Sequence, residues 1–175
     1  MAGNFVGNVE LENARIFSLN FSGREKVWNG KIINTEGTMN FCVSIPDDIA
    51  QDMIEDGWAV RLSAPRDEND EPSYFLPVEV KWRDRSRKLL PEKILPKIYM
   101  YSDGREVELD EDNIRILDGC DFETVDLVIH PRIWEDDNGE RKIKAYLYDG
   151  RFVVRESRIA RKYAHYSREN EAKID

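Results

Sequence analysis

The sequence predicts a mainly β fold, a small barrel or sandwich of short strands with one inserted helix. Apolar and polar residues alternate with a period of two in several segments, which is typical of strands with one face in water. Turn-forming residues separate these segments at short and regular intervals. The chain of 175 residues has the length of one domain, and 41% hydrophobic residues suffice for one core.

Each strand is predicted from its own alternating or apolar run. The predicted strands are residues 14–21, 38–45, 58–62, 74–82, 97–101, 125–134 and 142–147. Residues 137–139 (Asp-Asn-Gly) form a hairpin turn, and residues 149–150 form a turn into a last short run, residues 152–154. Pro77 has no N–H to donate, so its strand is expected at a sheet edge or at a bulge.

Helical spacing predicts one helix inside the domain. Pro46 and two aspartates open this helix, apolar residues follow at helical intervals, and Gly57 ends it in the left-handed conformation. Residues 109–117 form one helical turn or two. Residues 22–30 and 83–96 are expected to be loops, the second of them basic.

The chain is accordingly divided into three parts. Residues 1–11 form a flexible N-terminal arm, residues 12–156 the folded domain, and residues 157–175 a C-terminal helix and tail. The number and size of the strands fit a five-stranded Greek-key barrel of the oligonucleotide-binding (OB) type, with extra hairpins and the inserted helix.

Charge is unevenly distributed along the chain. The formal net charge of −9 argues against a nucleic-acid binder, because phosphate contacts need Lys and Arg. Residues 81–97 nevertheless hold seven bases and two acids, whereas residues 103–126 hold ten acids and two bases. The acidic total therefore conceals one basic stretch.

The sequence carries no catalytic or metal-binding signature. His130 and His165 have no partner at ligand spacing, and His130 is expected to be a hydrogen-bonded strand position. Cys42 and Cys120 lie far apart and are expected to be structural. A nucleophile elbow and a glycine-rich phosphate loop are missing. We therefore expect a binding protein rather than an enzyme, with no metal and no cofactor.

Membrane and export signals are also missing from the sequence. No apolar run approaches the roughly 20 residues that a membrane span needs, and the N-terminus lacks the pattern of a secretory signal. The sequence therefore predicts a cytoplasmic protein with no membrane partner.

Aromatic and basic side chains interleave in three places. Proteins that hold a single strand need aromatic faces for stacking and a positive groove for the phosphates. The candidate DNA-binding residues of the first loop are Arg24, Lys26, Trp28 and Lys31. Those of the basic segment are Lys81, Trp82, Arg83, Arg85, Arg87, Lys88, Lys97, Tyr99 and Tyr101. Those of the late hairpin are Arg132, Trp134, Lys142, Lys144, Tyr146 and Tyr148.

Strand parity supports the late hairpin in particular. The two lysines and two tyrosines at alternate positions from Lys142 to Tyr148 share one face, and the apolar residues between them share the other. By contrast, Trp58, Phe17 and Phe41 are expected to lie in the core. The late hairpin therefore predicts a nucleic-acid platform backed by a core.

The order and spacing of several short segments add a family resemblance. These segments are NFSGRE (residues 20–25), NFCV (40–43), residues 45–58 ending in EDGW, LPVEVKW (76–82), KIYM (97–100), residues 125–134 and IKAYL (143–147). Across residues 14–154 they resemble a family of phage and prophage single-stranded DNA-binding proteins with an OB fold.

The resemblance implies binding and protection of single-stranded DNA without sequence preference, in phage DNA replication or recombination. The action would take place in the cytoplasm of the bacterial host. Replication or recombination proteins are further candidate partners, and a homodimer is left open. Two features depart from the family pattern: the insertion at residues 83–96 is longer and more basic, and residues 169–175 lack an acidic tail with a terminal aromatic residue.

Two alternatives stay open from the sequence. The first is an acidic protein-interaction domain, a phage-encoded inhibitor that imitates nucleic acid with residues 103–126 and binds no DNA. The basic cluster at residues 81–88 counts against it. The second is a nuclease that holds Mg²⁺ with its carboxylates, although so many acids usually form a solvated face.

Overall fold

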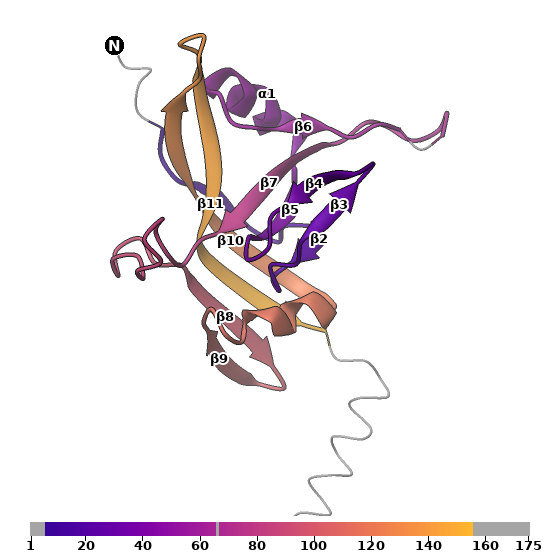
Figure 1. Ribbon diagram of the computed structural model, residues 1–175. Helices are drawn as coiled ribbons and strands as arrows, with labels where there is room; N and C mark the ends of the chain where they lie inside the picture. The colour runs from indigo at the N-terminus through magenta and orange to yellow at the C-terminus, as the bar shows by residue number, and fades with distance from the viewer. Residues whose placement is uncertain (1–5, 66, 156–175) are drawn as a thin grey trace, which may run out of the picture.

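The fold is mainly β, as the sequence predicts (Figure 1). A computed structural model of the chain describes residues 6–65 and 67–155. The elements are β1 (Val9–Leu11), β2 (Ile16–Asn20), β3 (Lys26–Trp28), β4 (Lys31–Asn34), β5 (Met39–Ile45), α1 (Asp47–Asp56), β6 (Arg61–Leu62), β7 (Tyr74–Val80), β8 (Lys97–Ser102), β9 (Arg105–Leu109), the 3-10 helix η2 (Ile114–Gly119), β10 (Phe122–Glu135) and β11 (Arg141–Val154). The expected C-terminal helix, residues 157–175, lies outside the described residues.

One large mixed sheet contains most of the described strands. Its main order is β1-β10-β11-β7-β5-β2, while β6 pairs with β7, and β8 joins β11 to β9. β11 runs parallel to β7 and β8, and the other pairs of this sheet are antiparallel. β1 and β2 stand at opposite ends of the order although they are consecutive in the chain. Between them, the Ala14 amide donates to the Val125 carbonyl of β10 at 2.7 Å. The N-terminal segment therefore links the two ends of the sheet.

The core lies on the inner face of this sheet. Alternate residues of β5, β7, β10 and β11 point inward and are buried, as the period of two predicts. At one end, Phe152 packs against Phe21 and Phe122, with ring centroids 5.8 and 5.5 Å away. Trp58 and Phe41 are buried as expected. Burial of so many aromatic and branched side chains is the main stabilising contribution.

The helix α1 follows its local signals. Pro46 precedes it, and Asp47 and Asp48 occupy its first turn, where carboxylates favour the positive end of the helix dipole. Gly57 ends the helix with φ of 105°, and its amide bonds to the carbonyl oxygens of Met53 and Ile54. A Cβ at Gly57 would lie 2.7 Å from the Arg141 carbonyl oxygen, so glycine also permits the close approach of β11.

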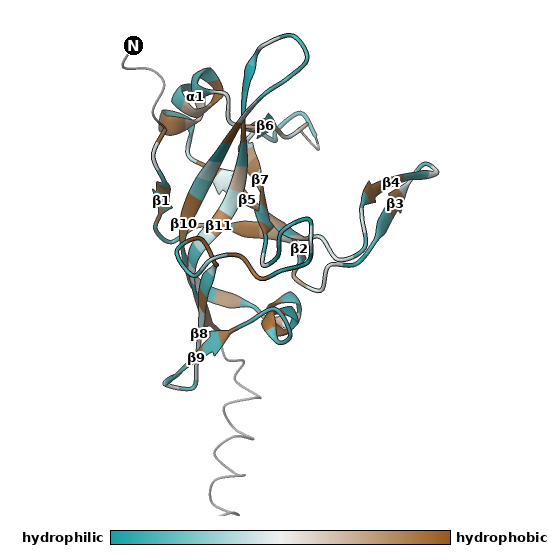
Figure 2. Ribbon diagram, turned by 60° about the vertical axis from the view of Figure 1, so that its left-hand side comes forward, coloured by the Kyte–Doolittle hydropathy of each residue, from teal (hydrophilic) through white to brown (hydrophobic). Residues whose placement is uncertain are grey.

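The N-terminal region is more regular than its composition predicts. Part of the expected arm, residues 1–11, is the strand β1, which pairs with β10. The expected loop at residues 22–30 contributes to a hairpin, β3–β4, which projects from the main sheet (Figure 2). Phe17, expected in the core, is 37% exposed. The φ of 52° at Ser18 and an irregular register beside Phe17 break the simple alternation of β2.

Pro77 is not at a sheet edge. β5 covers one side of β7 along its whole length, and on the other side β6 pairs at residues 74–75 and β11 at residues 78–79. Pro77 falls in the gap between those two partners, so no strand pairs with it on that side of β7.

The turn expected at residues 149–150 is part of the continuous strand β11. A register shift opposite Val128 and Ile129 accommodates one extra residue there, so the inward positions change from Leu147 to Gly150. Residues 105–109, for which the sequence predicted no strand, form β9. Within the described residues, no helix has the length and apolar character of a membrane span.

Candidate nucleic-acid interface

The outer face of the β10–β11 hairpin gathers aromatic and basic side chains. The register places His130 opposite Tyr146, Arg132 opposite Lys144, and Trp134 opposite Lys142. Directly opposite residues of antiparallel strands share one face. Together with the adjoining Tyr148, these residues form the β10–β11 platform: His130, Arg132, Trp134, Lys142, Lys144, Tyr146 and Tyr148.

The platform is positively charged around Tyr146. The Nζ atoms of Lys81 and Lys144 lie 5.8 and 5.5 Å from the centre of its ring. Glu79 accepts a 3.3 Å bond from Lys144. Within the described residues, Lys81 and Arg132 have no carboxylate within salt-bridge distance. A phosphate beside Tyr146 would therefore meet cations that the protein does not itself neutralise.

His130 is a hydrogen-bonded strand position, as expected. Its Nδ1 lies 2.8 Å from Asn8 Oδ1, and its ring centre lies 6.1 Å from that of Tyr148. The sequence pattern did not assign it to the interface. His130 shares the outward face of β10 with Arg132 and lies opposite Tyr146 of β11, so its ring borders the same surface as Tyr146.

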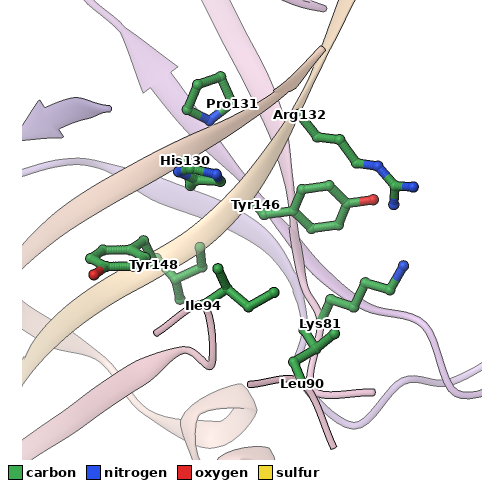
Figure 3. Close-up of a pocket in the computed structure, with 9 residues that line it drawn as sticks. Lys81, Leu90, Ile94, His130, Pro131, Arg132, Tyr146 and Tyr148 are labelled. Atoms are coloured by element: carbon green, nitrogen blue, oxygen red, sulfur yellow. The ribbon is translucent and has the colours of Figure 1, made fainter. Parts of the chain in front are cut away.

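A pocket of about 220 Å³ lies between the platform and the basic segment (Figure 3). Tyr146, Tyr148 and His130 form one side, and Leu90 and Ile94 of the segment 83–96 form the other. Lys81 and Arg132 lie at the same end of the pocket as the Tyr146 hydroxyl. The pocket therefore combines apolar walls with a cationic end.

The β3–β4 hairpin presents a second aromatic and basic group. Trp28 is 69% exposed and lies opposite Lys31 in the register. Lys26 and the neighbouring Arg24 are also exposed. Val27 and Ile32 form an exposed apolar pair on the hairpin as well.

Three asparagines fix the base of this hairpin. The side-chain amides of Asn20 and Asn34 donate to the Arg24 carbonyl at 2.9 and 2.7 Å. Asn40 donates to Asn34 Oδ1 at 2.6 Å. Asn20 and Asn34 are buried, so these bonds satisfy polar groups that would otherwise be costly. The predicted residues Arg24, Lys26, Trp28 and Lys31 are therefore held together, on an element separate from the platform.

The basic segment contributes exposed cations and one paired arginine. Arg85, Arg87 and Lys88 are exposed. Arg83 instead binds the Glu111 carboxylate through Nε at 2.8 and 3.0 Å and through a second guanidinium nitrogen at 2.8 Å. Arg83 therefore holds the segment against the region between β9 and η2.

Trp82 does not belong to the exposed surface. Its residue is 7% exposed, and its Nε1 is buried without a hydrogen-bond partner. It continues the inward positions of β7, which include Val78 and Val80. No ring face is available for a base, so we leave Trp82 out of the interface.

The predicted residues of β8 lie in a mixed electrostatic environment. Tyr99 and Tyr101 stand opposite Glu108 and Glu106 of β9. Lys97 pairs in register with Asp149 of β11 and lies 3.9 Å from Glu92. The Arg151 guanidinium lies 5.8 Å from the centre of the Tyr99 ring, but the carboxylates beside Tyr99 and Tyr101 repel phosphate, so β8 is less suited to a DNA backbone than the platform is.

An aromatic pair that the sequence did not assign to the interface lies further along the sheet. Phe17 and Phe75 make an edge-to-face contact with centroids 5.7 Å apart. Phe75 shares a strand face with Glu79, which is in register with Tyr146. The parity of residues 74–82 already places Phe75 on the same face as Lys81, and this was the available signal.

Three groups of the described chain have shifted pKa values. Burial raises the pKa of Cys42, although Arg61 and Lys26 lower it, and burial together with Asp121 raises that of Cys120. Both thiols therefore keep their protons, which agrees with structural roles. Burial also raises the pKa of Asp149, against the lowering effect of Arg151.

Comparisons with known proteins identify the family. The family described as "Putative phage ssDNA-binding domain" matches residues 4–175. No curated protein matches the chain. Among solved structures, the chain is similar to the single-stranded DNA-binding protein from bacteriophage Enc34 in complex with ssDNA, at 14% identity over 86% of this chain and 88% of that chain, with a TM-score of 0.49. A C-terminal truncation of the Enc34 protein gives 15% identity over 86% and 87% of the two chains, with the same TM-score of 0.49. The family match covers nearly the whole sequence, and the chain therefore belongs to the phage single-stranded DNA-binding domain family.

Proposed function

We propose that this single-stranded DNA-binding protein holds the strand on the β10–β11 platform without reading its sequence, and that it protects strands exposed during phage DNA replication or recombination. It would act by binding and not by catalysis, in the cytoplasm of the host bacterium. The family match favours this function over an acidic protein-interaction domain.

The alternation of rings and cations on one exposed face carries the proposal. His130, Tyr146 and Trp134 offer rings, while Arg132 and Lys144 lie between them. Bases stack on rings with a contribution of about 1–3 kcal/mol each, and cations follow the phosphates. Every base has a stacking face and every nucleotide has a phosphate, so such a surface binds without sequence preference.

Two further groups of the protein are candidates for contacts with the strand beyond the platform. The Phe17–Phe75 pair lies on the same sheet face as Tyr146, and the β3–β4 hairpin exposes Trp28 beside Lys31. We include the hairpin and the exposed cations of residues 83–96 in the proposed interface.

We further assign the domain to the OB-like barrels. In support, the strands β2, β5, β7, β11 and β10 are consecutive neighbours, and the segment from β1 to β2 returns to β10. This cycle matches a five-stranded Greek-key barrel, to which β8–β9, β3–β4 and α1 are additions.

Fluorescence anisotropy of labelled oligonucleotides tests the proposed function. The full chain is titrated with oligo-dT, a mixed-sequence strand and a duplex of equal length, each at low and raised salt. We expect similar affinities for the two single strands, weaker binding to the duplex, and a fall in affinity as salt rises. A strong sequence preference, or no binding by the folded protein, would contradict the proposal.

A further inference from the structure

The segment 83–96 is an ordered structure that its own contacts hold in place. Arg83 forms an ion pair with Glu111 and also donates a hydrogen bond to the Arg87 carbonyl at 2.8 Å. Asp84 Oδ1 accepts the backbone amides of Ser86 and Lys88 at 2.8 and 3.0 Å. The Leu90 amide bonds to the Trp82 carbonyl at 2.9 Å. These contacts together give the segment a defined shape.

This fixed segment directs apolar side chains toward the platform. Leu90 and Ile94 line the 220 Å³ pocket opposite Tyr146 and Tyr148 (Figure 3). Ile94 is 46% exposed, so its apolar surface faces the pocket and water instead of the core. Apolar walls on two sides favour an occupant that is itself flat and largely apolar on its faces.

The cationic end of the pocket indicates an occupant that also carries negative charge. Lys81 and Arg132 lie there, and neither has a carboxylate within salt-bridge distance among the described residues. A nucleotide of a DNA strand has both properties, a flat base and an adjoining phosphate. The volume of 220 Å³ is below the roughly 300–1,000 Å³ of sites for drug-sized molecules, which suits a single base.

We propose that this pocket takes one unpaired nucleobase of the bound strand, held between Ile94 and the tyrosines of the platform. The inference rests on the proposed function and assigns a role to the insertion at residues 83–96. A base in a duplex is stacked and paired, so its entry would first cost a few kcal/mol of unstacking and unpairing. The pocket would therefore favour single strands over duplex.

A cycle of two changes tests the contact between Ile94 and a base. Ile94→Ala removes apolar wall from the pocket, and a fully abasic strand removes every base while keeping the phosphates. Affinities of the full-length wild type and the variant are measured by anisotropy for oligo-dT and for the abasic strand of equal length. Leu89→Ala is the matched control, because Leu89 is an exposed leucine of the same segment that does not line the pocket.

We expect Ile94→Ala to weaken binding of oligo-dT by about 3- to 10-fold and to leave binding of the abasic strand unchanged, because only a base fills the pocket. Leu89→Ala should change neither affinity. An equal loss of affinity for both strands would show that Ile94 only positions the segment. No loss of affinity for either strand would show that no base occupies the pocket. Each of these results overturns the inference and leaves the proposed function intact. Absence of wild-type binding to oligo-dT would instead contradict the proposed function itself.

Discussion

Arg132 and Lys144 lie directly opposite each other on β10 and β11, so two cations face the same surface. Like charges at directly opposite positions destabilise a sheet. Glu79 offsets part of this repulsion through its 3.3 Å bond to Lys144. A DNA phosphate placed between the two cations would remove the rest. The pair therefore favours binding at some cost to the free protein.

Replacing Arg132 by Ala should weaken DNA binding without weakening the fold. The free energy of unfolding should stay the same or rise by a few tenths of a kcal/mol, because the repulsion is removed. The slope of log K against log salt should become shallower by about 0.7, the value for one phosphate contact on a single strand. Anisotropy titrations over a salt series measure the slope, and urea unfolding measures the stability.

Arg105→Ala is the charge-matched control for this experiment. Arg105 is exposed on β9, among the carboxylates Glu106 and Glu108. This variant should keep the wild-type salt slope. An equal change of slope in the two variants would mean that net charge, and not the platform, determines binding.

Tyr146 should act through its ring and not through its hydroxyl. Tyr146→Ala is expected to weaken binding to oligo-dT by about 1–3 kcal/mol, because one stacking surface is lost. Tyr146→Phe should bind within about a few tenths of a kcal/mol of the wild type, because the ring remains. Anisotropy at fixed salt compares the three proteins. Equal losses for Ala and Phe would assign the effect to the hydroxyl and exclude stacking.

Gly150→Ala should destabilise the domain. A Cβ at this position would lie 2.7 Å from the ring of Phe152, which is fully buried and enclosed by Phe21 and Phe122. Overpacking of this kind costs about 1–3 kcal/mol. Gly119→Ala is the control, because a Cβ there meets no atom within 4 Å. Urea unfolding of both variants decides the prediction, and equal stabilities would show that the Phe152 ring can move aside.

Asp149→Asn should stabilise the protein at neutral pH and lose this advantage in acid. Burial raises the pKa of Asp149 above 3.8, its ordinary value, so the folded state binds the proton more tightly than the unfolded state. The contribution of Asp149 to stability is therefore greatest below 3.8 and falls as pH rises through the raised pKa. Urea unfolding of both proteins should show a difference at pH 7 that shrinks as pH is lowered. A variant less stable than the wild type at pH 7 would mean that the Arg151 interaction outweighs burial.

Local signals predicted the helix α1 well, because the Pro46 start and the Gly57 end depend on neighbouring residues alone. The turn-forming residues Asp149 and Gly150 gave a wrong prediction, because pairing with β10 on one side and β8 on the other keeps the strand continuous there. Parity identified the face of the platform correctly at Lys144 and Tyr146. These successes concern contacts that are close in sequence or follow from strand alternation.

Trp82 is buried and Trp134 is exposed, and strand alternation explains this difference. Trp82 continues the inward positions of β7, whereas Trp134 shares the outward positions of β10 with Arg132. The alternation of residues 74–82 already placed Trp82 on the buried face, but the basic residues that flank it led to its assignment to the interface. The closure of the pocket could not be predicted, because it depends on the long-range contact between Arg83 and Glu111.

The most direct test of the platform is tryptophan fluorescence during titration with oligo-dT at low and high salt. Trp134 is 50% exposed on the platform, and Trp58 and Trp82 are buried, so the wild type is compared with Trp134→Phe and Trp28→Phe. The account predicts saturable quenching that weakens with salt and that clearly decreases in Trp134→Phe, with the exposed Trp28 of the β3–β4 hairpin contributing the remainder. Undiminished quenching in Trp134→Phe, or no quenching of the folded wild type at low salt, would contradict it.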